Sequence, residues 1–173
     1  MTSNAHTGNR ILGTLRSTKD KGAVCMEDHL DARVDDVWSA LTDPSRIAGW
    51  LGEVEGDLRL GGEFRARFFA SGWEGTGRVE VCKPPQRLLV VTKQANASEE
   101  QVIETELTPD GDKTTLVWEE RGMPVELVAA YGAGVQVHVE DLAAYLAGRE
   151  RCDAAARFDE LFPAYKALAA DLS

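Results

Sequence analysis

The chain has 173 residues, of which 43% are hydrophobic and 28% charged, and its formal net charge is −10. This length suits one domain with a sizeable core and is too short for two comfortable ones. The acidic balance argues against nucleic acid or an anionic membrane surface as partner, because phosphate binding needs clustered lysines and arginines. The three cysteines, Cys25, Cys82 and Cys152, are widely separated, which favours reduced thiols over a disulfide framework.

Targeting signals are missing from the N-terminal part of the sequence. No apolar run approaches the ~20 residues of a membrane span, and the first residues lack the basic, apolar and small-residue order of a signal peptide. We therefore predict a cytoplasmic protein that does not enter a membrane. Residues 1–9 are polar and contain Gly8, which predicts a disordered N-terminus, and residues 10–17 mix apolar with polar positions before a turn at Lys19–Gly22.

The next segment predicts a strand followed by two short helices. Residues 23–30 place apolar side chains at near-alternating positions, as expected for a strand with one covered face. Asp35 is suited to cap a helix that ends at Thr42-Asp43-Pro44, and Pro44 suits the first turn of another helix. The apolar edge of the second helix, with Trp50, is expected to face inward. The pair should cover one end of a sheet.

The pattern then changes to alternation. Residues 53–60 are predicted to form a strand with Leu58 and Leu60 on one face, and Gly61-Gly62 is predicted to reverse the chain. Turn-forming residues divide the following segment into further strands. These are predicted near residues 63–70, 73–82, 86–94, 100–108 and 113–121. The sequence therefore predicts an antiparallel meander.

Helical periodicity returns in the last third of the chain. Residues 124–147 repeat apolar positions at steps of three and four, which predicts one long helix. Gly132 and Gly134 cost about 1 kcal/mol each relative to Ala in a helix, so we expect them to allow a bend or a close approach to the sheet. Residues 149–173 predict an amphipathic extension, kinked or divided by Pro163.

These elements together predict an α+β helix-grip architecture, in which a curved antiparallel sheet wraps around the long helix. We expect a helix-grip domain over residues 10–148 and a C-terminal helical extension over residues 149–173.

Several motifs in this order resemble a known superfamily. The motifs are VWSALTDP, Trp50, DLRLGGEF, a glycine-bearing strand, KPPQRLLV, a threonine-rich strand and the terminal helix. Residues 23–147 resemble the START-like helix-grip superfamily (SRPBCC), in the branch of the heat-shock-protein ATPase activator homologues and the polyketide-cyclase-like bacterial proteins. The resemblance implies a cavity between sheet and helix. It also implies that the chain binds an apolar small molecule, modifies one, or docks onto a partner protein. Relatives often carry Gly-Trp early in the terminal helix, where this chain has Gly134-Val135, so we expect a larger pocket.

The candidate chemistry lies on the strand before the long helix and on that helix. Trp118 and Glu120 share a strand face with apolar residues, which places the Glu120 carboxylate at the expected cavity. His138 falls on the same helical face as Tyr131. A carboxylate and an imidazole can exchange protons when burial shifts their pKa values toward neutrality, so Glu120 and His138 are the candidate catalytic residues.

Aromatic side chains supply the predicted walls, because ligand pockets are mostly apolar with few polar groups. The predicted ligand-binding residues are Phe64, Phe68, Trp73, Trp118, Glu120, Tyr131, Val135 and His138. Core packing explains the aromatic residues equally well, and Trp38 and Trp50 are assigned to the scaffold.

Metal and cofactor chemistry has little support in the sequence. Glu53, Glu55 and Asp57 share a strand face, but an extended strand separates alternate carboxylates by about 7 Å. The spacing of Gly72, Gly75 and Gly77 lacks the following lysine and helix start of a phosphate-binding loop. We predict no metal and no cofactor.

Three hypotheses of function remain open at this point. The first is binding of an apolar or aromatic small molecule in the cavity. The second is a cofactor-free enzyme of the cyclase or dehydratase kind that acts on such a ligand. The third is a protein-binding module that meets a chaperone ATPase or a second copy of the chain.

Overall fold

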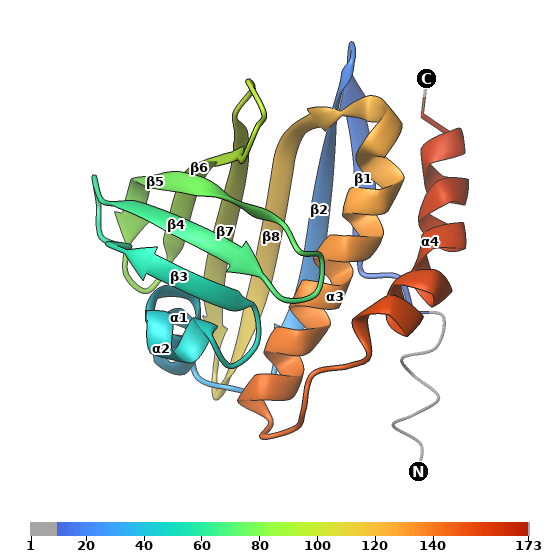
Figure 1. Ribbon diagram of the computed structural model, residues 1–173. Coiled ribbons are helices and arrows are strands. Elements are labelled where there is room, and N and C mark those ends of the chain that lie inside the picture. Colours follow the sequence, from blue (N-terminus) through green and yellow to red (C-terminus); the bar gives the residue numbers. More distant parts are fainter. Residues whose placement is uncertain (1–9, 173) are drawn as a thin grey trace.

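The computed structural model describes residues 10–172, which form a curved sheet with one long helix across its concave face and a second helix beside the first (Figure 1). The predicted disorder of residues 1–9 lies outside the described residues. The strands are β1 (Gly13–Thr18), β2 (Lys21–Leu30), β3 (Gly52–Gly56), β4 (Glu63–Phe68), β5 (Glu74–Lys83), β6 (Arg87–Gln94), β7 (Gln101–Asp110) and β8 (Lys113–Pro124). The helices are α1 (Val34–Thr42), α2 (Pro44–Ile47), the 3-10 turn η2 (Val125–Leu127), α3 (Val128–Leu146) and α4 (Ala154–Ala170).

The sheet confirms the predicted antiparallel meander. Its eight strands lie in the order β1-β2-β8-β7-β6-β5-β4-β3, and each pair of neighbours is antiparallel. Strands β3 to β8 follow the chain order in reverse, and β2 crosses over to pair with β8. Thus β8 lies inside the sheet, with β2 on one side and β7 on the other, and α3 packs mainly against β2 and β1. The α+β helix-grip class is confirmed.

Strand β1 is the element that sequence periodicity missed. It pairs with β2 through the turn at Lys19 and Asp20, from Gly13 opposite Met26 to Thr18 opposite Lys21. Only Gly13 and Leu15 of this strand are buried, so its apolar content is too low to mark a strand on its own. The pairing with β2 and the helix packed beyond it stabilise the strand.

The two short helices form at the predicted place, but the first begins differently. Arg33 rather than Asp35 is the N-cap of α1, and Asp35 lies in the first turn, where its charge favours the helix dipole. Asp43 caps α2 by accepting a hydrogen bond from the Ser45 N–H at 3.0 Å. Buried Trp50 donates its Nε1–H to the Ala40 carbonyl at 3.0 Å, which ties the segment after α2 to α1.

The strand predicted over residues 53–60 is wrong in its second half. Strand β3 ends at Gly56, and Leu60, expected to share a strand face with Leu58, is 66% exposed. The Asp57 carboxylate accepts hydrogen bonds from the backbone and side chain of Arg59, which holds a turn in place of an extended strand.

Helix α3 is buried on more than one face, because the sheet covers one side and α4 covers another (Figure 1). Gly132 marks the contact with α4. A Cβ there would lie 2.6 Å from Cδ1 of Tyr165, so Gly132 allows α4 to pack closely against α3. The predicted close approach of this glycine to the sheet is therefore replaced by a close approach to α4. A Cβ on Gly134 would meet no atom within 4 Å.

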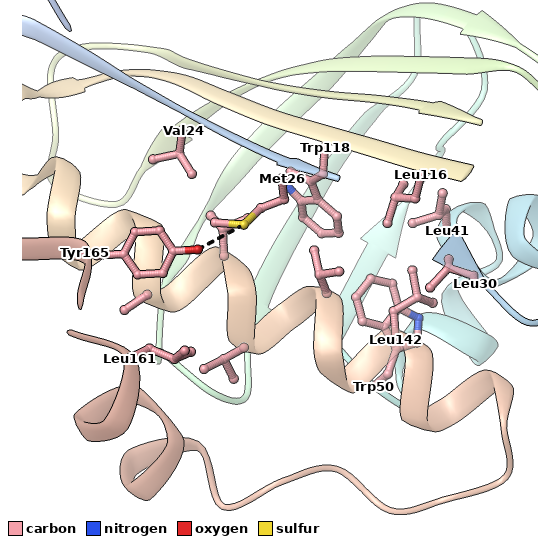
Figure 2. Close-up of a cluster of buried hydrophobic side chains, with 14 of the residues drawn as sticks. Val24, Met26, Leu30, Leu41, Trp50, Leu116, Trp118, Leu142, Leu161 and Tyr165 are labelled. Atoms are coloured by element: carbon pink, nitrogen blue, oxygen red, sulfur yellow. Dashed lines mark hydrogen bonds between the residues drawn. The ribbon is translucent and has the colours of Figure 1, made fainter. Parts of the chain in front are cut away.

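The C-terminal extension is a single helix, so a division into two parts is wrong; Pro163 lies inside α4. Leu161 and Tyr165 of α4 are fully buried and belong to the same core as Val24, Met26 and Trp118 (Figure 2). The Tyr165 hydroxyl donates to the Gln136 Oε1 at 2.6 Å and accepts from the Gly13 N–H at 3.1 Å. This hydrogen-bond network joins β1, α3 and α4.

Candidate functional site

A cavity of about 500 Å³ lies between the sheet and the two long helices. Its walls come from the end of β4, the turn at residues 70–73, β6, β7, β8, α3 and the first turns of α4. Exposed residues of the β4–β5 turn and of α4, among them Ser71 and Asp159, mark its mouth, whereas buried Glu120 and His138 mark its floor. This volume is in the range of small-molecule binding sites.

Glu120 is positioned by its strand. Thr114, Leu116, Trp118 and Glu120 all point inward, as the alternation predicts. The Trp118 Nε1–H donates to the Glu120 Oε2 at 3.1 Å, and Trp118 itself packs edge-on against Trp50 with the ring centroids 6.1 Å apart. The carboxyl group is therefore held by a rigid aromatic neighbour. Burial raises the pKa of Glu120 to about 7, although the Trp118 hydrogen bond opposes this effect.

His138 extends from α3 toward the same floor. Its ring lies 5.3 Å from the Phe68 ring in an edge-on arrangement and is stacked at 6.4 Å from the Trp118 ring. Burial lowers the pKa of His138 to about 4, so the imidazole is neutral at physiological pH.

The surroundings of the His138 ring determine which of its two nitrogens carries the proton. The His138 Nδ1 is buried and has no hydrogen-bond partner among the described residues. An unpaired buried N–H costs more than an unpaired lone pair, which places the proton of the neutral ring on Nε2. The cavity floor thus carries one N–H donor beside one carboxyl group.

Most of the predicted site residues meet at this cavity. Phe68, Trp73, Glu120, Tyr131, Val135 and His138 line it. Phe68 and Trp73 stack on each other with their ring centroids 4.9 Å apart. The Tyr131 hydroxyl accepts a hydrogen bond from the Gln101 Nε2 at 3.2 Å, which joins α3 to β7 at the cavity wall.

Phe64 and Trp118 lie elsewhere. Phe64 faces inward from β4 but packs over Gly77 and beside Val79, Leu88 and Val90, in a second core cluster. Trp118 belongs to the main core and reaches the cavity only through its contacts with Glu120 and His138. Both aromatics are on the predicted face of their strand. The curvature of the sheet decides which part of that face borders the cavity.

Sequence reasoning missed several wall residues. Thr92, Gln94, Gln101 and Ile103 point inward from β6 and β7, a placement that strand alternation could have suggested. Phe158 and Asp159 come from α4, and no local pattern indicates that this helix returns to the cavity.

The carboxylates Glu53, Glu55 and Asp57 take part in ion pairs on the outside of β3 and its following turn. Each pairs with one arginine, at 2.9 Å to Arg67, 3.6 Å to Arg65 and 3.0 Å to Arg59, respectively. None of these three carboxylates lines the cavity.

Comparison with known proteins identifies the family. Residues 31–147 match the model of the family described as activator of Hsp90 ATPase homolog 1-like protein, and this segment is more than half of the chain. The chain belongs to this family. The match ends within the linker after α3, so the family model does not include α4. No curated protein matches the chain.

Solved structures extend the similarity to most of the chain. The crystal structure of CalU16 from Micromonospora echinospora is 27% identical, with a TM-score of 0.76 over 92% of this chain and 98% of that one. DynU16, a protein of the dynemicin biosynthetic locus, is 32% identical with a TM-score of 0.68, over 76% of this chain. This chain spans only 50% of the DynU16 chain. Mll3558 from Rhizobium loti, at 24% identity and a TM-score of 0.64, shares the fold over 73% of this chain and 97% of that one.

Within residues 10–172, no helix combines the length and the apolar character that crossing a membrane requires.

Proposed function

We propose that this family member binds an apolar or aromatic small molecule in the cavity between the sheet and α3. The observation that carries the proposal is the cavity itself, with aromatic walls around a floor that holds two buried polar groups, Glu120 and His138. Apolar walls with a few converging polar groups are typical of ligand sites. We expect the protein to act in the cytoplasm.

The relatives support a ligand made by metabolism. DynU16 is a protein of a biosynthetic locus, and it is related to this chain at 32% identity. We extend that setting to this chain and expect an organic molecule from a biosynthetic pathway as its ligand.

Docking of a protein partner is less well supported. A docking module needs no internal volume, whereas this fold keeps about 500 Å³ open between sheet and helices. Helix α4 is also not an unpartnered amphipathic helix, because Leu161 and Tyr165 are buried within their own chain.

A second candidate function is favoured by the protonation states at the floor. A carboxyl group with a pKa of about 7 can both accept and donate a proton near neutral pH, and the neutral His138 beside the same cavity can hold a substrate oxygen. This combination supports cofactor-free proton transfer of the cyclase or dehydratase kind. If turnover occurs, Glu120→Gln and His138→Ala should each abolish it while leaving a folded protein that still binds the ligand. Full turnover in both variants would contradict the enzymatic role.

The binding proposal is tested by filling the cavity. Gly134 lines the cavity, and a side chain built there meets open space, so Gly134→Leu should occupy the site without disturbing the core. We expect the wild-type protein, isolated from its own source, to retain a small molecule in native mass spectrometry. We expect Gly134→Leu to lose that molecule and to bind naphthylmethanol at least about tenfold more weakly by calorimetry.

Ala167→Leu is the matched control, since it adds leucine to the exposed face of α4, away from the cavity. It should bind as the wild type does. Equal binding by wild type and Gly134→Leu, or no binding of any aromatic probe by the wild type, would overturn the proposal.

A further inference from the structure

The charges of the cavity are all of one sign. Glu120 lies at the floor and Asp159 at the mouth, and no lysine or arginine is among the described residues that line the cavity. His138 is neutral and does not compensate, because its burial disfavours the imidazolium form. An anionic ligand would enter a cavity that offers no positive charge, in a chain whose net charge is −10.

Glu120 lacks the partner that a buried carboxylate normally has. Within residues 10–172, its one hydrogen-bond donor is the Trp118 Nε1, and its neighbours across the sheet are apolar, Val24 on β2 and Ile103 on β7. Buried carboxylates are usually paired with a cation or with several donors. This one, 7% exposed and open only to the cavity, has room for such a partner in the ligand.

The walls around this carboxyl group favour a cation as well. Phe68 and Trp73 form a stacked pair, and Tyr131 and Phe158 add aromatic rings from α3 and α4. Aromatic ring faces attract ammonium groups, and the attraction grows when the pair is shielded from water. His138 is a second buried polar residue of the cavity floor.

We infer that the ligand is an aromatic molecule that carries a protonated nitrogen, and that this nitrogen pairs with the Glu120 carboxylate between the aromatic walls. The inference rests on the proposed binding function and narrows the ligand to a cationic class. The Nε2–H of His138 would then meet an acceptor atom, such as a carbonyl or ether oxygen, on the same ligand.

Three probes that share one ring system test the sign of the preferred charge. They are naphthylmethylamine, naphthylmethanol and naphthylacetate, which carry a positive, a neutral and a negative group on the same methylene. Charge-assisted hydrogen bonds are about twice as strong as neutral ones, so the amine should bind about tenfold more tightly than the alcohol, and the acetate most weakly. Calorimetry with the full-length protein measures all three.

Glu120→Gln assigns the preference to one residue, since glutamine keeps the shape and an acceptor for Trp118 but removes the charge. In this variant the amine and the alcohol should bind within about twofold of each other. Glu55→Gln makes the same change in net charge on the exposed outer face of β3, and it should keep the tenfold preference.

Changing pH gives an independent measurement. The neighbours of Glu120 are Trp118 on its own strand and apolar Val24 and Ile103 on the strands beside it, and His138, Tyr131 and Asp159 line the same cavity. Burial raises the pKa of Glu120 to about 7, so its carboxyl group ionises near neutral pH. The affinity for the amine should therefore rise between about pH 6 and pH 8, and the affinity for the alcohol should not.

The outcomes separate this inference from the function on which it rests. Equal binding of all three probes, or tightest binding of the acetate, overturns the cationic ligand and leaves the binding function intact. A tenfold preference that survives Glu120→Gln overturns the role of Glu120. Failure of all three probes, and of other aromatic molecules, to bind the wild type overturns the binding function itself.

Discussion

Glu120 illustrates at the residue scale how burial without a charged partner affects stability. Its pKa is raised from 4.5 to about 7, so the folded state holds the proton more tightly than the unfolded chain does. The free energy of unfolding therefore decreases as pH rises from about 4.5 to about 7, because the unfolded chain ionises first. The buried carboxyl group at the cavity floor therefore destabilises the folded state at neutral pH.

Glu120→Gln should remove this dependence. A shift of this size corresponds to about 3 kcal/mol, so the variant should gain about that much stability relative to wild type between pH 4.5 and pH 8. Urea unfolding at both pH values measures the difference. His138 is present in both proteins, so its opposite dependence cancels. If the difference in unfolding free energy between Glu120→Gln and wild type does not change with pH, the Glu120 side chain is solvated in the folded state. For the control Glu55→Gln, the difference from wild type should not change with pH.

At the element scale, α3 carries two glycines two residues apart, one closely packed and the other beside open space. Gly132 lies against the Tyr165 ring of α4, and Gly134 faces the open cavity. The same residue type thus serves close packing at one position and leaves volume at the other. This difference explains why helix propensity alone could not assign their roles.

Alanine at these two positions should act in opposite directions. Gly134→Ala should raise the free energy of unfolding by about 1 kcal/mol, because alanine favours a helix and its methyl group meets no atom within 4 Å. Gly132→Ala gains the same propensity, but its methyl group would lie 2.6 Å from the Tyr165 ring, so we expect a net loss of about 1–3 kcal/mol. Chemical denaturation of both variants measures this. Equal changes at the two positions would show that α4 does not pack here as described.

At the scale of the whole molecule, α4 completes both the core and the cavity. Leu161 and Tyr165 are fully buried, and Arg157 of α4 forms a two-pronged ion pair with Glu140 of α3 at 2.8 Å. The first turns of the same helix supply Phe158 and Asp159 to the cavity walls. The helix that lies beyond the family match therefore contributes to stability and to the proposed site.

Truncation after Gly148 should destroy the cooperative unfolding transition. Burial of each large apolar side chain contributes about 1.5–3 kcal/mol, and a domain of this size is stable by only about 5–15 kcal/mol in total. Loss of Leu161, Tyr165 and the hydrogen bonds of the Tyr165 hydroxyl removes a large part of that margin. Thermal unfolding followed by circular dichroism provides the measurement. A truncated chain that unfolds cooperatively at the wild-type temperature would contradict the structural role of α4.

The amino-acid sequence by itself determined the order and kind of most elements, because alternation, helical spacing and turn residues are local signals. It predicted the strands from β4 to β8, the helix pair before them and the long helix α3. It also predicted that Glu120 and His138 face the same interior, since strand and helix periodicity define which side chains share a face.

The tertiary structure decided what periodicity cannot contain. Strand β1 forms because β2 pairs with it, and α4 borders the cavity because Tyr165 anchors it on Gly13 and Gln136, which are 152 and 29 residues away in the chain. Sheet curvature placed Phe68 at the cavity and Phe64 in a separate cluster, although both share one strand face. A cavity is a space left between distant elements, so its walls and its charges appear only when those elements are assembled.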